Sequence, residues 1–180
     1  MNLKNIAIGI GALFIAVLLW AMFIYSPKDF TYVGISDFSN HVENRSSISY
    51  ADTVAHVALQ VMGIEYIVVS IYDVPDHMTR FFSRNGKDLH GFVLQDSENV
   101  YRIFMSTTLS RNKYLLYMAH EVIHIAQIHE GRMDVSRAPF VRYEGIIYST
   151  NHVEYEDRPW EIEAFDRQQE IKHLMGGILF

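Results

Sequence analysis

An uncharged run of twenty mostly apolar residues near the N-terminus constrains this chain more than any other feature. Residues 6–25 read IAIGIGALFIAVLLWAMFIY, and the helix-breaking pair Ser26-Pro27 follows. A helix of this length spans about 30 Å, the thickness of the hydrocarbon core of a membrane. The run has no polar face that could point to solvent from a soluble domain. We therefore expect residues 1–27 to form a transmembrane anchor.

A cleaved signal peptide is the main alternative for this run. Signal peptides have an apolar region of about 7–15 residues and a small-x-small cleavage site, whereas this run is longer and no A-x-A triplet follows it. Lys4 and the free amine favour a cytoplasmic N-terminus, although Lys28 and Arg45 on the other side weaken this bias. We predict a single-pass membrane protein whose domain lies outside the cytoplasm.

The rest of the chain has the composition of one folded domain. The sequence has 180 residues, of which 49% are hydrophobic, and this is enough for one core. Its net charge of −6 argues against a nucleic-acid-binding surface, which is usually basic. The lack of cysteine excludes disulfides, thiol nucleophiles and cysteine-based zinc fingers. We assign 28–50 to a polar spacer and 51–180 to the domain, and the oligomeric state stays open.

Residue patterns after position 50 predict an α+β fold with a small, mostly antiparallel sheet. Helical spacing marks three segments, 52–62, 112–128 and 159–175. Gly176-Gly177 is expected to end the last helix. β-Branched and aromatic runs indicate four strands, 65–74, 90–95, 100–105 and 142–150. The second and third of these flank a hairpin connection.

The motif H-E-x-x-H lies inside the longest of these helical segments, in the sequence MAHEVIHIAQ at 118–127. On a helix, His120 and His124 lie one above the other, so both imidazoles can reach one tetrahedral ion. Glu121 lies about 100° round the helix and can take a proton from water without binding the metal. Apolar neighbours indicate a buried helix, in which unpartnered polar side chains would be costly. We expect Zn²⁺ at this site.

A third ligand has to come from another part of the chain. The longer pattern H-E-x-x-H-x-x-G-x-x-H is absent, because Gln127 stands where it requires glycine. The later segment RPWEIEA offers Glu161 and Glu163. At 100° per residue, Glu163 falls in the polar arc with Asp166, Arg167 and Glu170. Glu161 falls on the opposite, inward side and in the first helical turn, where the helix dipole favours a negative charge. We therefore prefer Glu161.

These residues resemble the gluzincin division of zinc metallopeptidases, which carry H-E-x-x-H followed by E-x-x-A on a later helix. HEVIHIAQ, YEGIIY, Tyr155 and RPWEIEA resemble more closely the small minimal-gluzincin-like metallopeptidases of bacteria and phages, over roughly 89–174. The resemblance implies a zincin-like domain that hydrolyses peptide or protein substrates. In such a domain His120, His124 and Glu161 bind zinc, and Glu121 is the general base.

The chain departs from the gluzincin pattern after the alanine of RPWEIEA. Gluzincins often carry Asp or Asn there, whereas this chain has Phe165. A hydrogen-bond partner for an imidazole N–H could then come from Asp157, Asp166 or Gln127.

Other residues near the motif have open roles. Tyr148 and Tyr155 lie between the two ligand helices, and either hydroxyl could stabilise an oxyanion, or both could simply pack in the fold. The resemblance suggests that strand 100–105 pairs with an extended substrate peptide. His129, His152 and His173 are expected at the surface. Alternatively, the protein binds zinc but hydrolyses another kind of amide bond, or it has lost hydrolytic activity.

Overall fold

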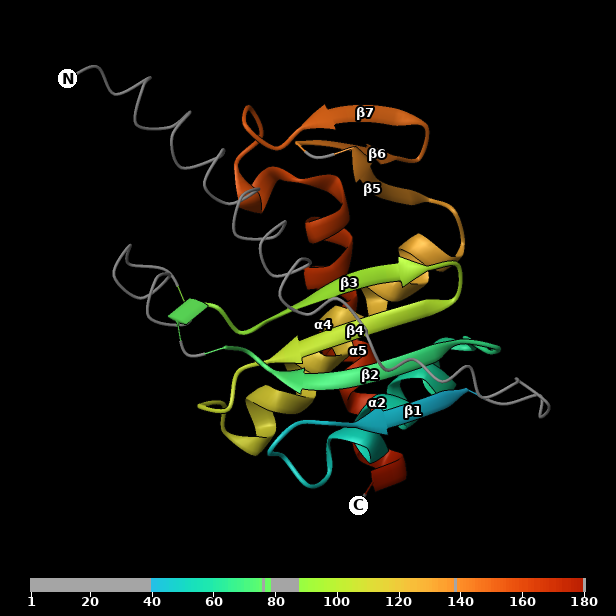
Figure 1. Cartoon of the computed structure of the whole chain (residues 1–180), viewed down its shortest axis with the longest axis vertical. Helices are drawn as coiled ribbons and strands as arrows, with labels where there is room; N and C mark the ends of the chain where they lie inside the picture. Colours follow the sequence, from blue (N-terminus) through green and yellow to red (C-terminus); the bar gives the residue numbers. More distant parts are fainter. Residues whose placement is uncertain (1–39, 76, 79–87, 138, 180) are drawn as a thin grey trace.

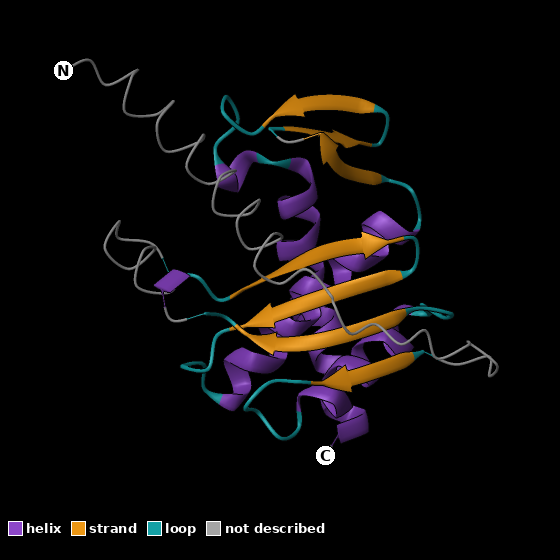
Figure 2. Cartoon of the chain, in the orientation of Figure 1, coloured by secondary structure: helices purple, strands orange, loops and turns teal. Residues whose placement is uncertain are grey.

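In the described part of the chain, three α-helices lie against a four-stranded sheet. Figure 1 and Figure 2 show that the helices cover one face of this sheet. The computed structural model describes residues 40–75, 77–78, 88–137 and 139–179. The helices in this part are α2 (Ala51–Met62), α4 (Arg111–His129) and α5 (Pro159–Leu179). The predicted α+β class is therefore correct.

The predicted anchor at 1–27 lies outside the described residues, as does the spacer up to residue 39. Within the described ranges, no helix is both long and apolar enough to cross a membrane. Strand β1 (His41–Asn44) falls inside the segment 28–50, and it pairs with the rest of the sheet.

The main sheet has the strand order β1-β2-β4-β3, with β2 at Val68–Asp73, β3 at Gly91–Ser97 and β4 at Val100–Met105. The β1–β2 and β2–β4 pairs are parallel, and β3 is the antiparallel strand at the edge. The expectation of a mostly antiparallel sheet is thus wrong for this sheet. Helix α2 carries the chain across the sheet between β1 and β2, and such a crossover makes neighbouring strands parallel.

A second sheet of three antiparallel strands lies beside the start of α5 (Figure 1). Its strands are β5 (Met133–Arg137), β6 (Phe140–Tyr143) and β7 (Ile146–Ser149). The sequence patterns predict one extended segment over 142–150, but the chain reverses at Glu144-Gly145. Both residues have positive φ angles, 48° and 82°, as the tightest hairpin turns require. Tyr143 pairs with Ile146 across this two-residue turn.

The core lies between the main sheet and the helices. Helix α2 buries its apolar face there and ends at Gly63, whose φ of 67° is a left-handed conformation that glycine adopts easily. Helix α5 continues through Gly176-Gly177 to Leu179, so the predicted end of this helix is wrong. Glycine permits a helix to end but does not force it, and here buried Met175 and half-buried Leu179 keep the last turns on the core.

Helix α4 lies in the middle of the molecule, between α2, α5 and the sheet. Side chains from Met118 to Gln127 are buried on every side of the helix. Polar residues of this segment therefore cannot reach solvent and have to find partners in the interior. This burial brings the H-E-x-x-H motif and α5 together.

Candidate metal centre

The two histidines of the motif extend from successive turns of α4 toward α5. His120 and His124 are 3% and 9% exposed, and their rings are nearly perpendicular, with centroids 4.7 Å apart. Their Nε2 atoms are separated by 3.1 Å. The i, i+4 spacing on a helix produces this convergence, as the sequence predicts.

Glu161 joins them from the first turn of α5. Its Oε2 lies 3.3 Å from Nε2 of His120 and 3.4 Å from Nε2 of His124. Ala164, one turn further along, is fully buried in the contact between α4 and α5. Burial opposes ionisation of Glu161, but its contacts with the two histidines outweigh burial and hold the pKa of the carboxyl below its ordinary value. The carboxylate is therefore charged.

These three side chains form a group that could hold a metal ion, and their ligand atoms all lie within 4.8 Å of one another. Two imidazole nitrogens and a carboxylate oxygen are ligands that suit zinc and neighbouring transition metals. Without a cation, the two Nε2 lone pairs and the carboxylate repel one another, and a proton has to separate them. Burial opposes protonation of His124, yet its contacts with Glu161 prevail and raise its pKa to about 9. The site therefore favours a positive charge at its centre.

Glu121 is buried beside this group without belonging to it. Its side chain is 4% exposed, and Oε2 has no hydrogen-bond partner among the described residues. Burial raises the pKa of Glu121, although the nearby His120 and His124 partly oppose the shift. A buried carboxyl with a raised pKa and a free oxygen is suited to exchanging a proton.

Gly91, at the start of β3, makes room for Glu121. A Cβ atom at this position would lie 3.0 Å from Oε1 of Glu121, and equally close to Met105 Sδ and the Phe104 carbonyl oxygen. No sequence pattern marks this glycine, because its contact with α4 arises only when β3 packs over the helix.

Gln127 is the residue that orients an imidazole of the group. Its Oε1 lies 2.8 Å from Nδ1 of His124, on the side of the ring that faces away from Glu161. Asp157 and Asp166, the other two candidates, are exposed and make no hydrogen bond to either histidine within the described structure. The long amide reaches His124 because both lie on the inward face of α4, three residues apart.

Phe165 packs against His120 at the position where gluzincins often carry Asp or Asn. The two ring centroids are 4.8 Å apart. In the described part of the chain, His120 Nδ1 is buried without a hydrogen-bond partner. At this position the chain departs from the gluzincin pattern, and Nδ1 of His120 has ring packing beside it instead of a hydrogen-bond acceptor.

The two tyrosines have different surroundings. Tyr155 lies in the short 3₁₀ helix η1 (Tyr155–Asp157), and its hydroxyl interacts electrostatically with Glu161. Burial of the hydroxyl and the charge of Glu161 both raise the pKa of Tyr155, so it stays a proton donor. Tyr148, on β7, packs against Trp160 with ring centroids 5.8 Å apart. The structure thus brings Tyr155, and not Tyr148, to the metal ligands.

Glu163 does not lie in solvent, so its predicted position is wrong. The side chain is 20% exposed and is bound by Arg132 and Arg167 at distances of 2.7–3.0 Å. Tyr143 and Gln127 also donate hydrogen bonds to it. The helical wheel fails here because it considers one helix alone, whereas Arg132 lies just before β5 and Tyr143 lies on β6. His129, His152 and His173 are exposed, as expected.

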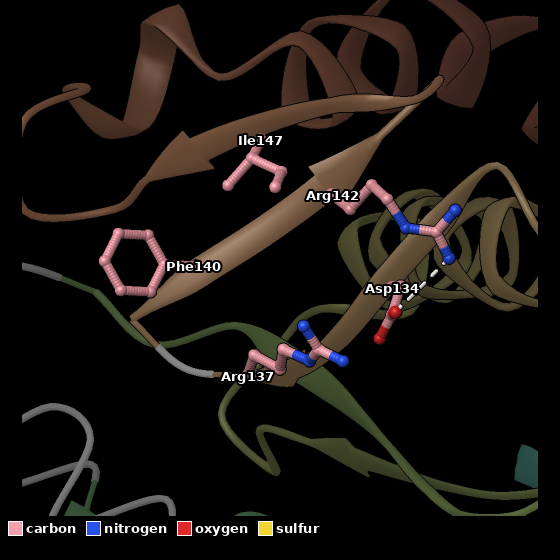
Figure 3. A pocket seen from close by; sticks show the side chains of 5 residues that line it. All are labelled: Asp134, Arg137, Phe140, Arg142 and Ile147. Atoms are coloured by element: carbon pink, nitrogen blue, oxygen red, sulfur yellow. Dashed lines mark hydrogen bonds and ion pairs between the residues drawn. The ribbon is translucent and has the colours of Figure 1, made fainter.

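A separate hollow of about 460 Å³ lies on the outer face of the second sheet (Figure 3). Five side chains line it, namely Asp134, Arg137, Phe140, Arg142 and Ile147. None of them belongs to the candidate metal group.

Comparison with known proteins assigns no family. The sequence matches no protein-family model and no curated protein. The resemblance to gluzincins therefore rests on the motif residues and on their convergence in the fold.

Proposed function

We propose that this protein is a membrane-anchored zinc peptidase of the gluzincin type. The observation that carries the proposal is the convergence of His120, His124 and Glu161 in a buried group, with the carboxyl of Glu121 beside them. Each of the four side chains comes from a position that the sequence motifs single out.

The choice of ligands supports a catalytic metal site. Structural zinc is usually held by four protein ligands, whereas catalytic zinc has three and keeps one position open. Within the described structure, the group comprises three residues. A bound zinc ion would supply Lewis acidity, which polarises a carbonyl group and acidifies water.

Glu121 is the proposed general base. It adjoins the ligand group but does not belong to it, so its carboxyl can accept a proton from the attacking water and pass it to the leaving amine. Its raised pKa brings the carboxyl closer to neutral pH, where one group can both take up a proton and release it. A site without chemistry would need no buried carboxyl at this place.

The edge strand β3 is the proposed docking strand for an extended peptide. Strand β4, suggested by the family resemblance, is excluded because it pairs with β2 on one side and β3 on the other. Within the described residues, β3 pairs with β4 alone, and Gly91 places its first residue beside Glu121. Main-chain hydrogen bonds along the edge of β3 that faces away from β4 would hold a peptide across the site.

Tyr155 is the proposed stabiliser of the oxyanion. Its hydroxyl is a proton donor held beside Glu161, and small movements would turn it toward a substrate carbonyl. Tyr155→Phe would then lower the turnover number and leave zinc content unchanged.

Metal analysis and hydrolysis by the full-length protein in detergent test this function together. We expect about one zinc per chain and cleavage of an unstructured protein such as casein. Glu121→Gln preserves size and the ligands, so zinc should stay bound while hydrolysis falls by at least ~10²-fold. Absence of zinc from wild type would refute the proposal. Bound zinc without cleavage of any protein would favour the alternative, a zinc protein that acts on another amide or that only binds.

The location is proposed from the sequence of residues 1–27. Their apolar run would anchor the chain in a membrane, with the domain outside the cytoplasm. Protease treatment of intact spheroplasts should digest the domain if this orientation is correct, and protection of the domain would reverse it.

A further inference from the structure

The side-chain amide of Gln127 has a fixed orientation between α4 and α5. Its Nε2 donates to two acceptors on α5, the Trp160 carbonyl oxygen at 3.0 Å and Oε2 of Glu163 at 2.9 Å. Its Oε1 faces Nδ1 of His124 at 2.8 Å. A rotated amide would bring its oxygen against a carbonyl and a carboxylate, so these acceptors allow one orientation.

This orientation determines which nitrogen of His124 carries hydrogen. Oε1 can only accept, so Nδ1 must donate, and the hydrogen is present at Nδ1 in both the neutral and the protonated ring. Nε2 is then the nitrogen that can give its lone pair to a metal, and it is the atom beside Glu161. A flipped amide would present N–H groups to Nδ1 and favour hydrogen on Nε2, where it blocks a metal.

Glu163 is itself held in place from the second sheet. Arg132, which precedes β5, binds both of its oxygens at 2.7 and 3.0 Å, and Tyr143 on β6 donates to Oε2. Arg167 also forms an ion pair with Glu163, 2.8 Å from Oε1. Two guanidinium groups therefore donate to this carboxylate, so the oxygen that faces Gln127 is an acceptor.

We propose that Glu163 is a positioning residue for the metal centre, acting on His124 through the amide of Gln127. Its carboxylate, together with the Trp160 carbonyl, holds the Gln127 amide in one orientation, and that orientation keeps the hydrogen of His124 on Nδ1. The second sheet takes part through Arg132 and Tyr143, so it supports the site as well as covering it. The inference rests on the proposed metal site for its function, but the orientation of the amide does not require a metal.

Nitrogen-15 NMR of the full-length protein in detergent, first without metal and then with zinc, tests the inference. Wild type should show a slowly exchanging hydrogen on Nδ1 of His124, because Oε1 of Gln127 accepts it. In Glu163→Gln this signal should broaden or disappear, since the new amide at position 163 can face Gln127 with either end. Zinc affinity should fall by about 10-fold, the lower end of the effect of outer partners on metal sites.

Arg167→Gln is the matched control. Arg167 binds Oε1 of Glu163, whereas Gln127 contacts Oε2. This variant therefore loses an ion pair of the same carboxylate and keeps the hydrogen bonds from Glu163 through Gln127 to His124. Its His124 signal and zinc affinity should match wild type. If Arg167→Gln and Glu163→Gln have equal effects on both, the carboxylate acts through general stability and the proposal is wrong.

An exchange of the two side chains separates positioning from stability. Gln127→Glu places a carboxylate against His124, and both ends of a carboxylate accept hydrogen bonds. Glu163→Gln in the same chain supplies an amide N–H that can donate to this carboxylate. The double variant should recover the Nδ1 hydrogen, because a carboxylate can only accept, although its second oxygen then faces the Trp160 carbonyl and should lower stability. An intact Nδ1 signal in Glu163→Gln alone would overturn the proposal, even if wild type bound no zinc and the peptidase function failed.

Discussion

Gly91→Ala adds one methyl group at the point where β3 passes over Glu121. The new Cβ would lie 3.0 Å from Glu121 Oε1, Met105 Sδ and the Phe104 carbonyl oxygen, whereas ordinary contacts begin near 3.4 Å. The neighbours have to move by about 0.4 Å to reach that distance. The carbonyl of Phe104 belongs to β4, a strand paired on both sides, so the side chains of Glu121 and Met105 are the ones that yield.

The cost to stability and the cost to catalysis differ in this variant. Extra volume in a packed interior destabilises a protein by about 1–3 kcal/mol. Replacement of glycine recovers about 0.4–1 kcal/mol because the unfolded chain loses freedom. The net loss should lie between about 0 and 2.6 kcal/mol, which is the difference of these two ranges. Hydrolysis should fall more, by up to ~10²-fold, because a small displacement of a catalytic group has an effect of this size.

Thermal unfolding, zinc content and the turnover number at saturating substrate measure these effects separately. Zinc should stay at the wild-type level, since Gly91 contacts Glu121 and not the ligand group. Gly176→Ala is the matched control, because the same methyl group there would meet nothing within 4 Å. It should stabilise α5 by about 0.5–1 kcal/mol and leave hydrolysis unchanged. If Gly91→Ala had full zinc content and the wild-type turnover number, catalysis would not depend on the position of the Glu121 carboxyl beside Gly91, and this reasoning would be refuted.

Three further outcomes are expected. Glu161→Gln should lose both zinc and hydrolysis, and a variant that kept its zinc on metal analysis would remove Glu161 from the ligands. In the folded metal-free protein, the pKa of His124 is raised from 6.5 to about 9. Protonated His124 should therefore contribute its full stabilisation below pH 6.5, and this contribution should be lost as the pH rises through 9. Thermal melts of chelator-treated protein measure this, and a melting temperature that does not change over this pH range would contradict it. Full-length protein should stay with membranes after a high-pH wash, and a soluble mature form without residues 1–25 would reveal a cleaved signal peptide.

The parts of the site that the sequence predicts correctly depend on spacing within one helix. His120 and His124 converge because a helix repeats every 3.6 residues, and this holds wherever the helix packs. The inward position of Glu161 also follows from its own helix, with Ala164 and Gln168 buried on the same side. Local periodicity is sufficient for these residues.

The parts that the sequence does not predict depend on contacts between distant segments. Glu163 lies in the polar arc of α5, but Arg132, just before β5, and Tyr143, on β6, bind its carboxylate, and β5 has no clear sequence signal. The parallel direction of β1, β2 and β4 depends on the crossover of the chain, which strand composition does not encode. The requirement for glycine at position 91 likewise arises only when β3 meets α4.

The contacts between α4 and α5 close a long loop of the chain. His120 and Glu161 are 41 residues apart, Gln127 and Glu163 are 36 apart, and the second sheet lies almost wholly between them. A metal ion at the first contact would act as a cross-link, which limits the freedom of the unfolded chain much as a disulfide does. In a chain without cysteine, the free energy of metal binding would then also keep the second sheet folded.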